Sequence, residues 1–207
     1  MSPGSEVSIK YLTNDTLAKM AEDFLSQQNS LGKVPIPIEE IVEIKLGIRV
    51  VPIPELHRLH GFDSYLVLGE EPTIVIDHDR YEGMLERTRF TYAHELAHYL
   101  LHSDLYKAAK IKDEEDYIRF QNSLGKDSEK RLEIQAFVLA SYLLVPQEDF
   151  RSFVDAFLKE RNGNILPSDI GELIIALSDR YKVSGDCVYK HLQVEYRTLM
   201  EKFYFAI

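Results

Sequence analysis

One stretch of the 207-residue sequence, RFTYAHELAHYLLH at positions 89–102, constrains the fold and the chemistry more than any other part. Apolar residues recur through it at helical spacing without a proline or glycine, which predicts a helix over about residues 84–102. Residues four apart share one face of a helix, with Cβ atoms about 5–6 Å apart. His94 and His98 can therefore offer their ring nitrogens to one metal ion.

The glutamate that directly follows the first histidine completes the H-E-x-x-H pattern of zinc peptidases. A catalytic zinc site uses three protein ligands and keeps a further position for water. Glu95 is rotated by about 100° from His94 around the helix, so its carboxylate can act as a base on that water without binding the metal. Leu96 and Ala97 inside the motif are apolar, which predicts partial burial. The charge of Glu95 would be costly in a partly buried segment unless it had a partner or a function. This favours a functional site over a chance pattern on an exposed helix.

A third protein ligand has to come from outside the motif. Glu133 lies beside an apolar stripe on a helix predicted from Ser128 to about Leu144, and packing of that stripe turns its carboxylate inward. Asp104 is the main alternative, because the extended motif H-E-x-x-H-x-x-G-x-x-[HD] places a ligand there. Leu101 replaces the glycine of that motif, however, so the helix is expected to continue and carry Asp104 away. Glu129 is a further candidate.

The remaining patterns predict an α+β fold with a zincin-like core. Helices are expected before and after the motif, and three short runs rich in β-branched residues predict a small antiparallel sheet packed on helices. The predicted helices cover 13–29 and 35–47, and the strands 48–53, 64–68 and 73–77. The polar segment 103–127 is expected to be a charged loop with one short strand at 117–121.

Two domains are expected, a zincin-like metallopeptidase domain at 1–150 and a helical segment at 151–207 packed on it. A turn at 183–185 between two predicted helices has the outline of a helix-turn-helix. Acidic side chains outnumber basic ones six to five between Ser168 and Ile207, whereas a DNA-reading helix needs a positive face. Direct DNA binding is therefore not expected, and the tail is interpreted as a structural or protein-docking element.

Composition narrows the cellular setting. The net charge of −10 repels nucleic acid over most of the surface. The single cysteine, Cys187, cannot form an internal disulfide, which fits a reducing cytoplasm. Apolar runs fall short of the roughly 20 residues that span a bilayer, and the first residues lack the order of a signal peptide. We expect a cytoplasmic protein with no membrane partner.

Three blocks, VPIPIEEIVEIKLGIRVV, RFTYAHELAHYLLH and EIQAFVLASYLLVP, occur in this order and resemble the ImmA/IrrE family of zinc metallopeptidases over about residues 13–150. The third block of that family reads E-x-x-A-N-x-F-A-A-x-L-L-M-P, and its first glutamate is a zinc ligand. The resemblance therefore implies Glu133 as the third ligand of Zn²⁺. Phe137 stands where the family usually has Asn or Asp, and Ala97 where Gly is common, but every ligand position is filled.

The resemblance also implies a function. Members of this family typically cleave a repressor-type transcription factor inside the cell, often one encoded beside them on a phage or mobile element. The expected partner is thus a protein substrate, a helix-turn-helix repressor. One alternative is a non-catalytic regulatory protein acting through the tail, but a scaffold would need the ligands and not the base Glu95. A second alternative is a hydrolase of non-peptide amides.

Other polar residues near the motif receive weaker interpretations. His102, one turn beyond His98, is expected on the helix surface, the alternative being a hydrogen bond that orients a ligand. Tyr92 and Tyr99 are expected to pack as aromatic side chains. No residue that stabilises the transition state can be named from the sequence.

Overall fold

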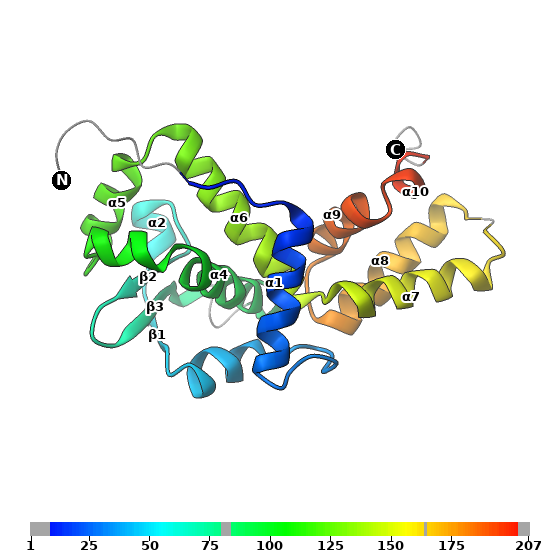
Figure 1. Ribbon diagram of the computed structural model, residues 1–207, viewed down its shortest axis with the longest axis horizontal. Helices are drawn as coiled ribbons and strands as arrows, with labels where there is room; N and C mark the ends of the chain where they lie inside the picture. Colours follow the sequence, from blue (N-terminus) through cyan, green and yellow to red (C-terminus); the bar gives the residue numbers. More distant parts are fainter. Residues whose placement is uncertain (1–8, 80–83, 164, 203–207) are drawn as a thin grey trace.

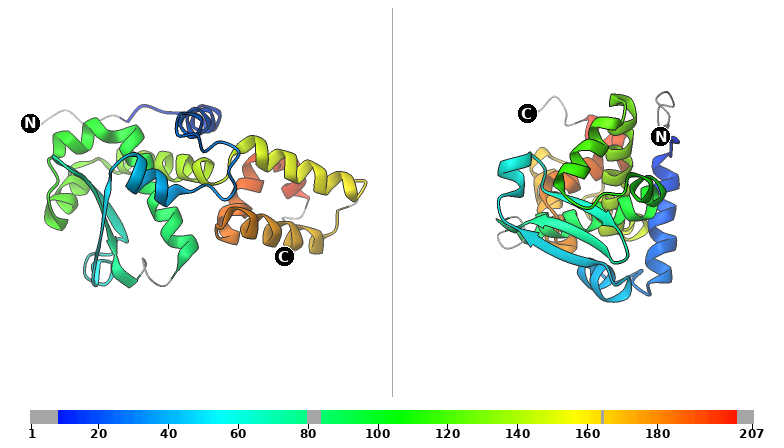
Figure 2. Two further views of the ribbon diagram at one scale, coloured as in Figure 1. Left: turned by 90° about the horizontal axis from the view of Figure 1, so that it is seen from below. Right: turned by 90° about the vertical axis from the view of Figure 1, so that its left-hand side faces the viewer.

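The computed structural model describes residues 9–79, 84–163 and 165–202. The sheet and the helices around it lie at one end of an elongated molecule, and the last four helices gather at the other end (Figures 1 and 2). In chain order the elements are α1 (Asn14–Gln27), the π-helical turn η1 (Glu40–Lys45), β1 (Arg49–Ile53), α2 (Leu56–His60), β2 (Ser64–Leu68), β3 (Pro72–Asp77), α4 (Leu85–Ala109), α5 (Glu114–Ser123), α6 (Lys126–Leu144), α7 (Gln147–Glu160), α8 (Pro167–Tyr181), α9 (Gly185–Glu195) and α10 (Arg197–Glu201).

The three strands form one sheet in the order β1–β3–β2. The α+β class and the three strands are confirmed, but the prediction of a wholly antiparallel sheet was wrong. β2 and β3 run antiparallel, with Ser64 opposite Ile76, whereas β1 and β3 run parallel, with Arg49 opposite Thr73. Between β1 and β3 the chain passes through α2 and β2, and this crossover brings β3 back in the direction of β1.

The motif helix α4 packs against both the sheet and α6. Small residues make the contact between the two helices close, since Ala93 and Ala97 of α4 and Ala136 and Ala140 of α6 are fully buried. Without large side chains between them, the helix axes approach and side chains from both can meet. The helix predicted from Ser128 to Leu144 is confirmed as α6.

The two predicted N-terminal helices are present, and each follows a local signal. Thr13 caps α1, its hydroxyl accepting a hydrogen bond from the backbone N–H of Thr16 at 3.2 Å. The second helix closes with a π-type turn, in which the N–H of Leu46 reaches the carbonyl of Ile41 at 3.0 Å. Gly47 follows at φ +65°, a left-handed conformation that ends the helix.

The segment 103–127 differs from its prediction as a charged loop with a strand. α4 continues to Ala109, and α5 occupies most of the remainder, including residues 117–121. Asp113 caps α5 by accepting from the N–H of Asp116 at 2.9 Å. Tyr117 and Phe120 are buried on its inner face, at the spacing of one helical turn. The charged residues around these two positions concealed the amphipathic pattern in the sequence.

The described part of the tail consists of the helices α7 to α10 joined by short turns, in agreement with the helical prediction; residues 164 and 203–207 of that prediction lie outside the described residues. Ser184 caps α9 by accepting from the N–H of Cys187 at 3.2 Å, so α8 and α9 are joined by a short turn and the helix-turn-helix outline is confirmed. Among the helices in the described ranges, none combines the length and the apolar character needed to cross a membrane.

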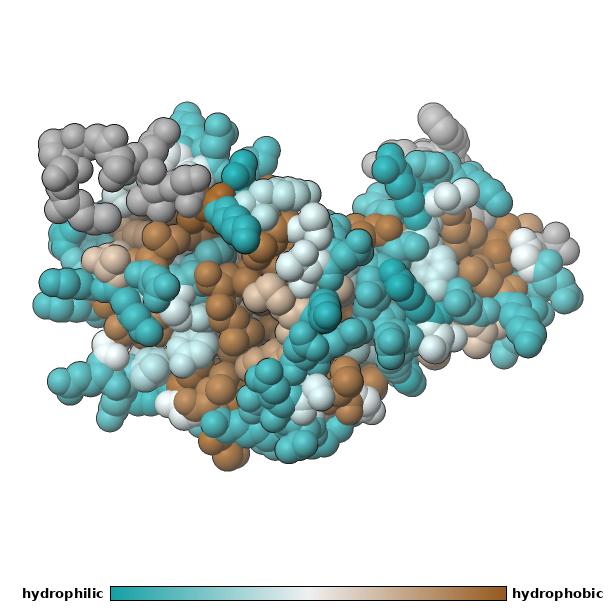
Figure 3. Space-filling model, in the orientation of Figure 1, coloured by the Kyte–Doolittle hydropathy of each residue, from teal (hydrophilic) through white to brown (hydrophobic). Residues whose placement is uncertain are grey.

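Hydrophobic side chains reach the surface in two areas of the face in Figure 3, one over the region of α4 and α6 and one on the tail.

Polar contacts join the tail to α6. The hydroxyl of Tyr142 in α6 donates to Glu195 in α9 at 2.8 Å. Ser141 Oγ lies 2.8 Å from Nδ1 of His191.

Arg89 of α4 is a buried charge that joins three segments. It is 6% exposed, and its guanidinium donates to the carbonyl of Ile36 at 2.7 Å, to the Glu39 carboxylate at 2.9 Å and to the carbonyl of Lys182 at 3.3 Å. The Glu39 side chain is 35% exposed, but the Arg89 guanidinium and Ile36 are buried, so the loss of Arg89 would leave the buried carbonyl of Ile36 without a ready replacement for its donor.

We expect Arg89→Ala to lower the free energy of unfolding by about 3 kcal/mol, the cost of removing one partner of a buried pair. Urea denaturation measures it. Arg119→Ala is the control, because the side chain of Arg119 is 68% exposed and its loss is expected to change stability by less than about 0.5 kcal/mol. Equal stabilities of the two variants would contradict the structural role of Arg89.

Candidate metal centre

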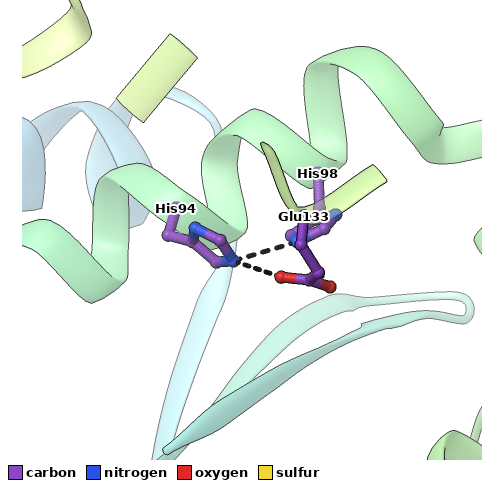
Figure 4. A group of neighbouring side chains, drawn as sticks. All are labelled: His94, His98 and Glu133. Atoms are coloured by element: carbon purple, nitrogen blue, oxygen red, sulfur yellow. Dashed lines mark hydrogen bonds and ion pairs between the residues drawn. The ribbon is translucent and has the colours of Figure 1, made fainter. Parts of the chain in front are cut away.

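Two histidines of α4 and one glutamate of α6 bring their ligand atoms together, and these atoms all lie within 4.8 Å of one another. The two Nε2 atoms of His94 and His98 are 3.1 Å apart. The carboxylate of Glu133 lies 3.2 Å from His94 Nε2 and 3.7 Å from His98 Nε2. Figure 4 shows both imidazole rings projecting from α4 and converging with this carboxylate.

The donor set fits a zinc ion. Nitrogen and oxygen atoms that bind one zinc ion at about 2.0–2.2 Å in a tetrahedral arrangement lie about 3.3–3.6 Å from each other. The three separations lie close to this range, and the set matches the two histidines and one glutamate of known catalytic zinc sites. His94, His98 and Glu133, the three residues predicted as ligands, lie close together and are compatible with a metal site; zinc binding by them stays a prediction.

The two alternative ligands lie elsewhere. Asp104 is exposed because α4 continues through Leu101 without the glycine turn that would fold the chain under the metal. Glu129 lies one turn before Glu133 in α6, and neither alternative belongs to the metal-compatible group found among the described residues.

Charge within the group favours metal binding. Burial lowers the pKa of His98 to about 4, so its ring is neutral near pH 7, the state in which histidine binds a metal. Burial by itself would raise the pKa of Glu133, but the hydrogen bonds and charges of His94 and His98 hold it well below its usual range. The carboxylate is thus ionised and ready to act as a ligand.

Glu95 is buried at 3% exposure beside the metal-compatible group. Its Oε1 accepts a hydrogen bond from the hydroxyl of Ser64 in β2 at 2.6 Å. Its Oε2 has no hydrogen-bond partner among the described residues. Burial raises the pKa of this carboxyl to about 7, against the opposing effects of His94 and Ser64. One oxygen is therefore fixed and the other is free to take a proton.

His102 lies behind the metal-compatible group and is 4% exposed, so the expectation of a surface position was wrong. Its Nε2 lies 3.2 Å from Oε1 of Gln135, and its Nδ1 lies 3.2 Å from Nδ1 of His98. The Gln135 amide nitrogen donates to the carbonyl of Lys10 at 2.6 Å, which leaves its oxygen to accept from His102. His102 then accepts at Nδ1 from the N–H of His98, and the lone pair of His98 Nε2 faces the group.

We expect His102→Leu to weaken zinc binding about 10- to 100-fold, the usual effect of removing a partner that orients a ligand. Competition with a chromophoric chelator measures the affinity. His191→Leu is the control, since His191 is also a buried histidine, at 4% exposure, but lies in the tail. Wild-type affinity in the His102 variant would contradict the proposed orientation of His98.

A cavity of about 310 Å³, the active-site cavity, opens beside these residues. Its lining includes His94, Glu95 and Glu133, together with His57, Tyr117 and Gln121. The last three were not identified as site residues from the sequence. Tyr117 and Gln121 belong to α5, at positions that were predicted as a short strand within a charged loop. A helix predicted over residues 114–123 would have placed Tyr117 and Gln121 on one face, one turn apart, and could have identified these two residues. Tyr92, by contrast, is fully buried and donates to Glu43 at 2.9 Å, in agreement with the predicted packing role.

The active-site cavity adjoins a larger hollow of about 830 Å³, and both are lined by Asp63, Phe90 and Thr91. Apolar side chains line much of this hollow, including Met84, Leu85, Phe90 and Phe137. It extends to Ser184 and Cys187 at the start of α9. A chain bound at the metal-compatible group could thus continue along an apolar surface toward the tail.

Comparison with known families agrees with this geometry. The search of curated proteins found no match. The Peptidase_M78 model, described as the IrrE N-terminal-like domain, matches residues 45–192, a range that contains the whole metal-compatible group and reaches into α9. The match crosses residue 150, so a domain boundary there stays a prediction. Because it covers most of the 207 residues, the chain belongs to the Peptidase_M78 family of metallopeptidases, in agreement with the ImmA/IrrE resemblance of its sequence.

Proposed function

We propose that the protein is a zinc-dependent endopeptidase that uses Glu95 as its general base. The observation that carries this proposal is the convergence of His94, His98 and Glu133 beside a buried carboxylate with one oxygen unpartnered among the described residues. A zinc ion supplies Lewis acidity when bound, lowering the pKa of water and polarising a carbonyl group. A site without catalytic function would need the three ligands but not this free carboxylate oxygen.

The protein's own groups divide the remaining work. Ser64 holds Oε1 of Glu95 at 2.6 Å, which directs Oε2 to accept the proton of the attacking water. The protonated Glu95 can then deliver that proton to the amine that leaves when the peptide bond breaks. Burial supports both transfers, because a carboxyl with a pKa of about 7 can both accept and release a proton near neutral pH.

The proposed substrate is a protein segment in an extended conformation. The apolar hollow beside the active-site cavity is large enough for bulky apolar side chains on one side of the cleaved bond. The ImmA/IrrE resemblance supports a narrower proposal, in which the substrate is a helix-turn-helix repressor in the cytoplasm and its cleavage derepresses genes of a phage, a mobile element or a stress response. The acidic balance of the tail supports a role in protein contacts rather than DNA binding.

The test is cleavage of a peptide library prepared from a bacterial proteome, read by mass spectrometry. The zinc-loaded protein is expected to produce new peptide ends with a preference for apolar residues on one side, and EDTA is expected to abolish them. Candidate repressors that contain the preferred sequence are then tested as folded proteins. A zinc-loaded protein that cleaves neither the library nor any repressor would contradict the proposed function.

A further inference from the structure

The active-site cavity contains a tyrosine whose position is fixed from several sides. Tyr117 of α5 is 6% exposed and lines this cavity together with Glu95 and Glu133. Its ring stacks on that of Tyr65, with centroids 5.3 Å apart, and meets the edge of Phe62 at 5.0 Å. The hydroxyl group is therefore held in place before any substrate arrives.

Hydrogen bonds to Tyr117 leave its own proton available. The Gln121 amide, one turn later in α5, donates to the Tyr117 oxygen at 3.0 Å. The hydroxyl of Tyr106 in α4 also interacts with it. A phenolic oxygen can accept from both groups, and its own O–H then remains able to donate. Burial and the nearby carboxylates of Glu95 and Glu133 raise the pKa of Tyr117 well above its ordinary value, so this proton is retained at neutral pH.

We propose that the O–H of Tyr117 donates a hydrogen bond to the substrate carbonyl oxygen while that oxygen gains negative charge. This inference rests on the proposed peptidase function. In the step, the water oxygen bonds to the carbonyl carbon, the C=O π electrons move to the oxygen, and Glu95 takes the water proton. Tyr117 keeps its own proton and stabilises the new charge. When the C–N bond breaks, the π bond re-forms and the proton on Glu95 moves to the leaving nitrogen.

A second group could serve the same purpose. His57 also lines the active-site cavity, and its Nδ1 lies 2.7 Å from Oδ1 of Asp63. Its side chain is 47% exposed, so water competes for its remaining nitrogen. A preorganised donor in a site that excludes water stabilises developing charge better than an exposed one, and this favours Tyr117.

The test compares Tyr117→Phe with Tyr65→Phe. Both variants lose one hydroxyl from stacked rings, but the Tyr65 hydroxyl donates to Glu114 and Tyr65 is not among the described lining residues of the cavity. On the library peptide that the wild type cleaves best, Tyr117→Phe is expected to lower kcat about 100-fold with little change in KM, as for the loss of one oxyanion donor. Tyr65→Phe is expected to retain wild-type kinetics.

A binding measurement separates this inference from the proposed function. The Co²⁺-loaded proteins are titrated with acetohydroxamate, an anionic metal ligand, and followed by visible absorption. Tyr117→Phe is expected to bind it about 10-fold more weakly than the wild type and Tyr65→Phe, the effect of one hydrogen bond to a charged group.

Equal acetohydroxamate affinities of the three proteins would overturn the role of Tyr117 even if the wild type is an active peptidase. Loss of kcat in His57→Ala but not in Tyr117→Phe would also overturn it. If the wild type cleaves nothing, the proposed function fails, and the acetohydroxamate comparison still decides whether Tyr117 donates. A protein that takes up no metal would overturn both.

Discussion

Glu95→Gln is expected to lower kcat/KM for the best library peptide about 10³- to 10⁴-fold while the protein keeps its zinc. General base catalysis contributes about 10²- to 10⁴-fold in enzymes. Glu95 lines the active-site cavity outside the metal-compatible group, and its buried Oε2 has no hydrogen-bond partner among the described residues. The other such carboxylate of the cavity, that of Asp63, is paired with His57 and Arg87. A glutamine amide has the same shape and can still accept from Ser64, but it cannot take a proton. Kinetics with purified protein and zinc analysis by mass spectrometry measure both quantities.

The control for this substitution is Asp104→Asn, the same acid-to-amide change at an exposed position of the same helix. It is expected to leave kcat/KM and zinc content at wild-type values. A Glu95→Gln protein that retains zinc and cleaves at the wild-type rate would contradict the role of Glu95 as base. It would leave the metal centre in place and point to a different group as proton acceptor.

The features that the sequence predicted well depend on local periodicity. His94 and His98 lie on one face because four residues complete about one helical turn, and this spacing does not depend on the rest of the fold. Glu133 was predictable because it borders an apolar stripe whose burial in α6 turns the carboxylate toward α4. In both cases a helix with a strong apolar face fixed the direction of the functional side chain.

The features that the sequence did not predict depend on contacts between distant segments. The parallel pairing of β1 with β3 depends on how the chain crosses through α2 and β2, which strand composition does not encode. His102 was expected on the surface because its partner Gln135 lies 33 residues away on another helix. Tyr117 was assigned to a short strand at 117–121 because apolar and polar residues alternate there, whereas the structure continues the helix α5 through these positions.

Glu133→Ala is expected to remove stable zinc binding and with it all measurable peptidase activity. The variant retains His94 and His98, but two imidazoles without the carboxylate leave the metal with too few protein ligands for a stable site. Zinc binding to the folded state stabilises it. Zinc is therefore expected to raise the Tm of the wild type and to leave that of Glu133→Ala unchanged, a difference that thermal unfolding with and without zinc measures directly.

The control is Glu129→Ala, one helical turn earlier in α6, which tests the alternative ligand with the same substitution. It is expected to bind one zinc ion per chain and to show the wild-type rise in Tm. The reverse result, in which Glu129→Ala loses the metal and Glu133→Ala keeps it, would contradict the ligand set. The ligand set would also be contradicted if both variants bound zinc fully and Asp104→Ala did not. Because the carboxylate of Glu133 lies 3.2 Å from His94 and 3.7 Å from His98, we expect that, among the substitutions of these three acidic residues, only that of Glu133 abolishes the site.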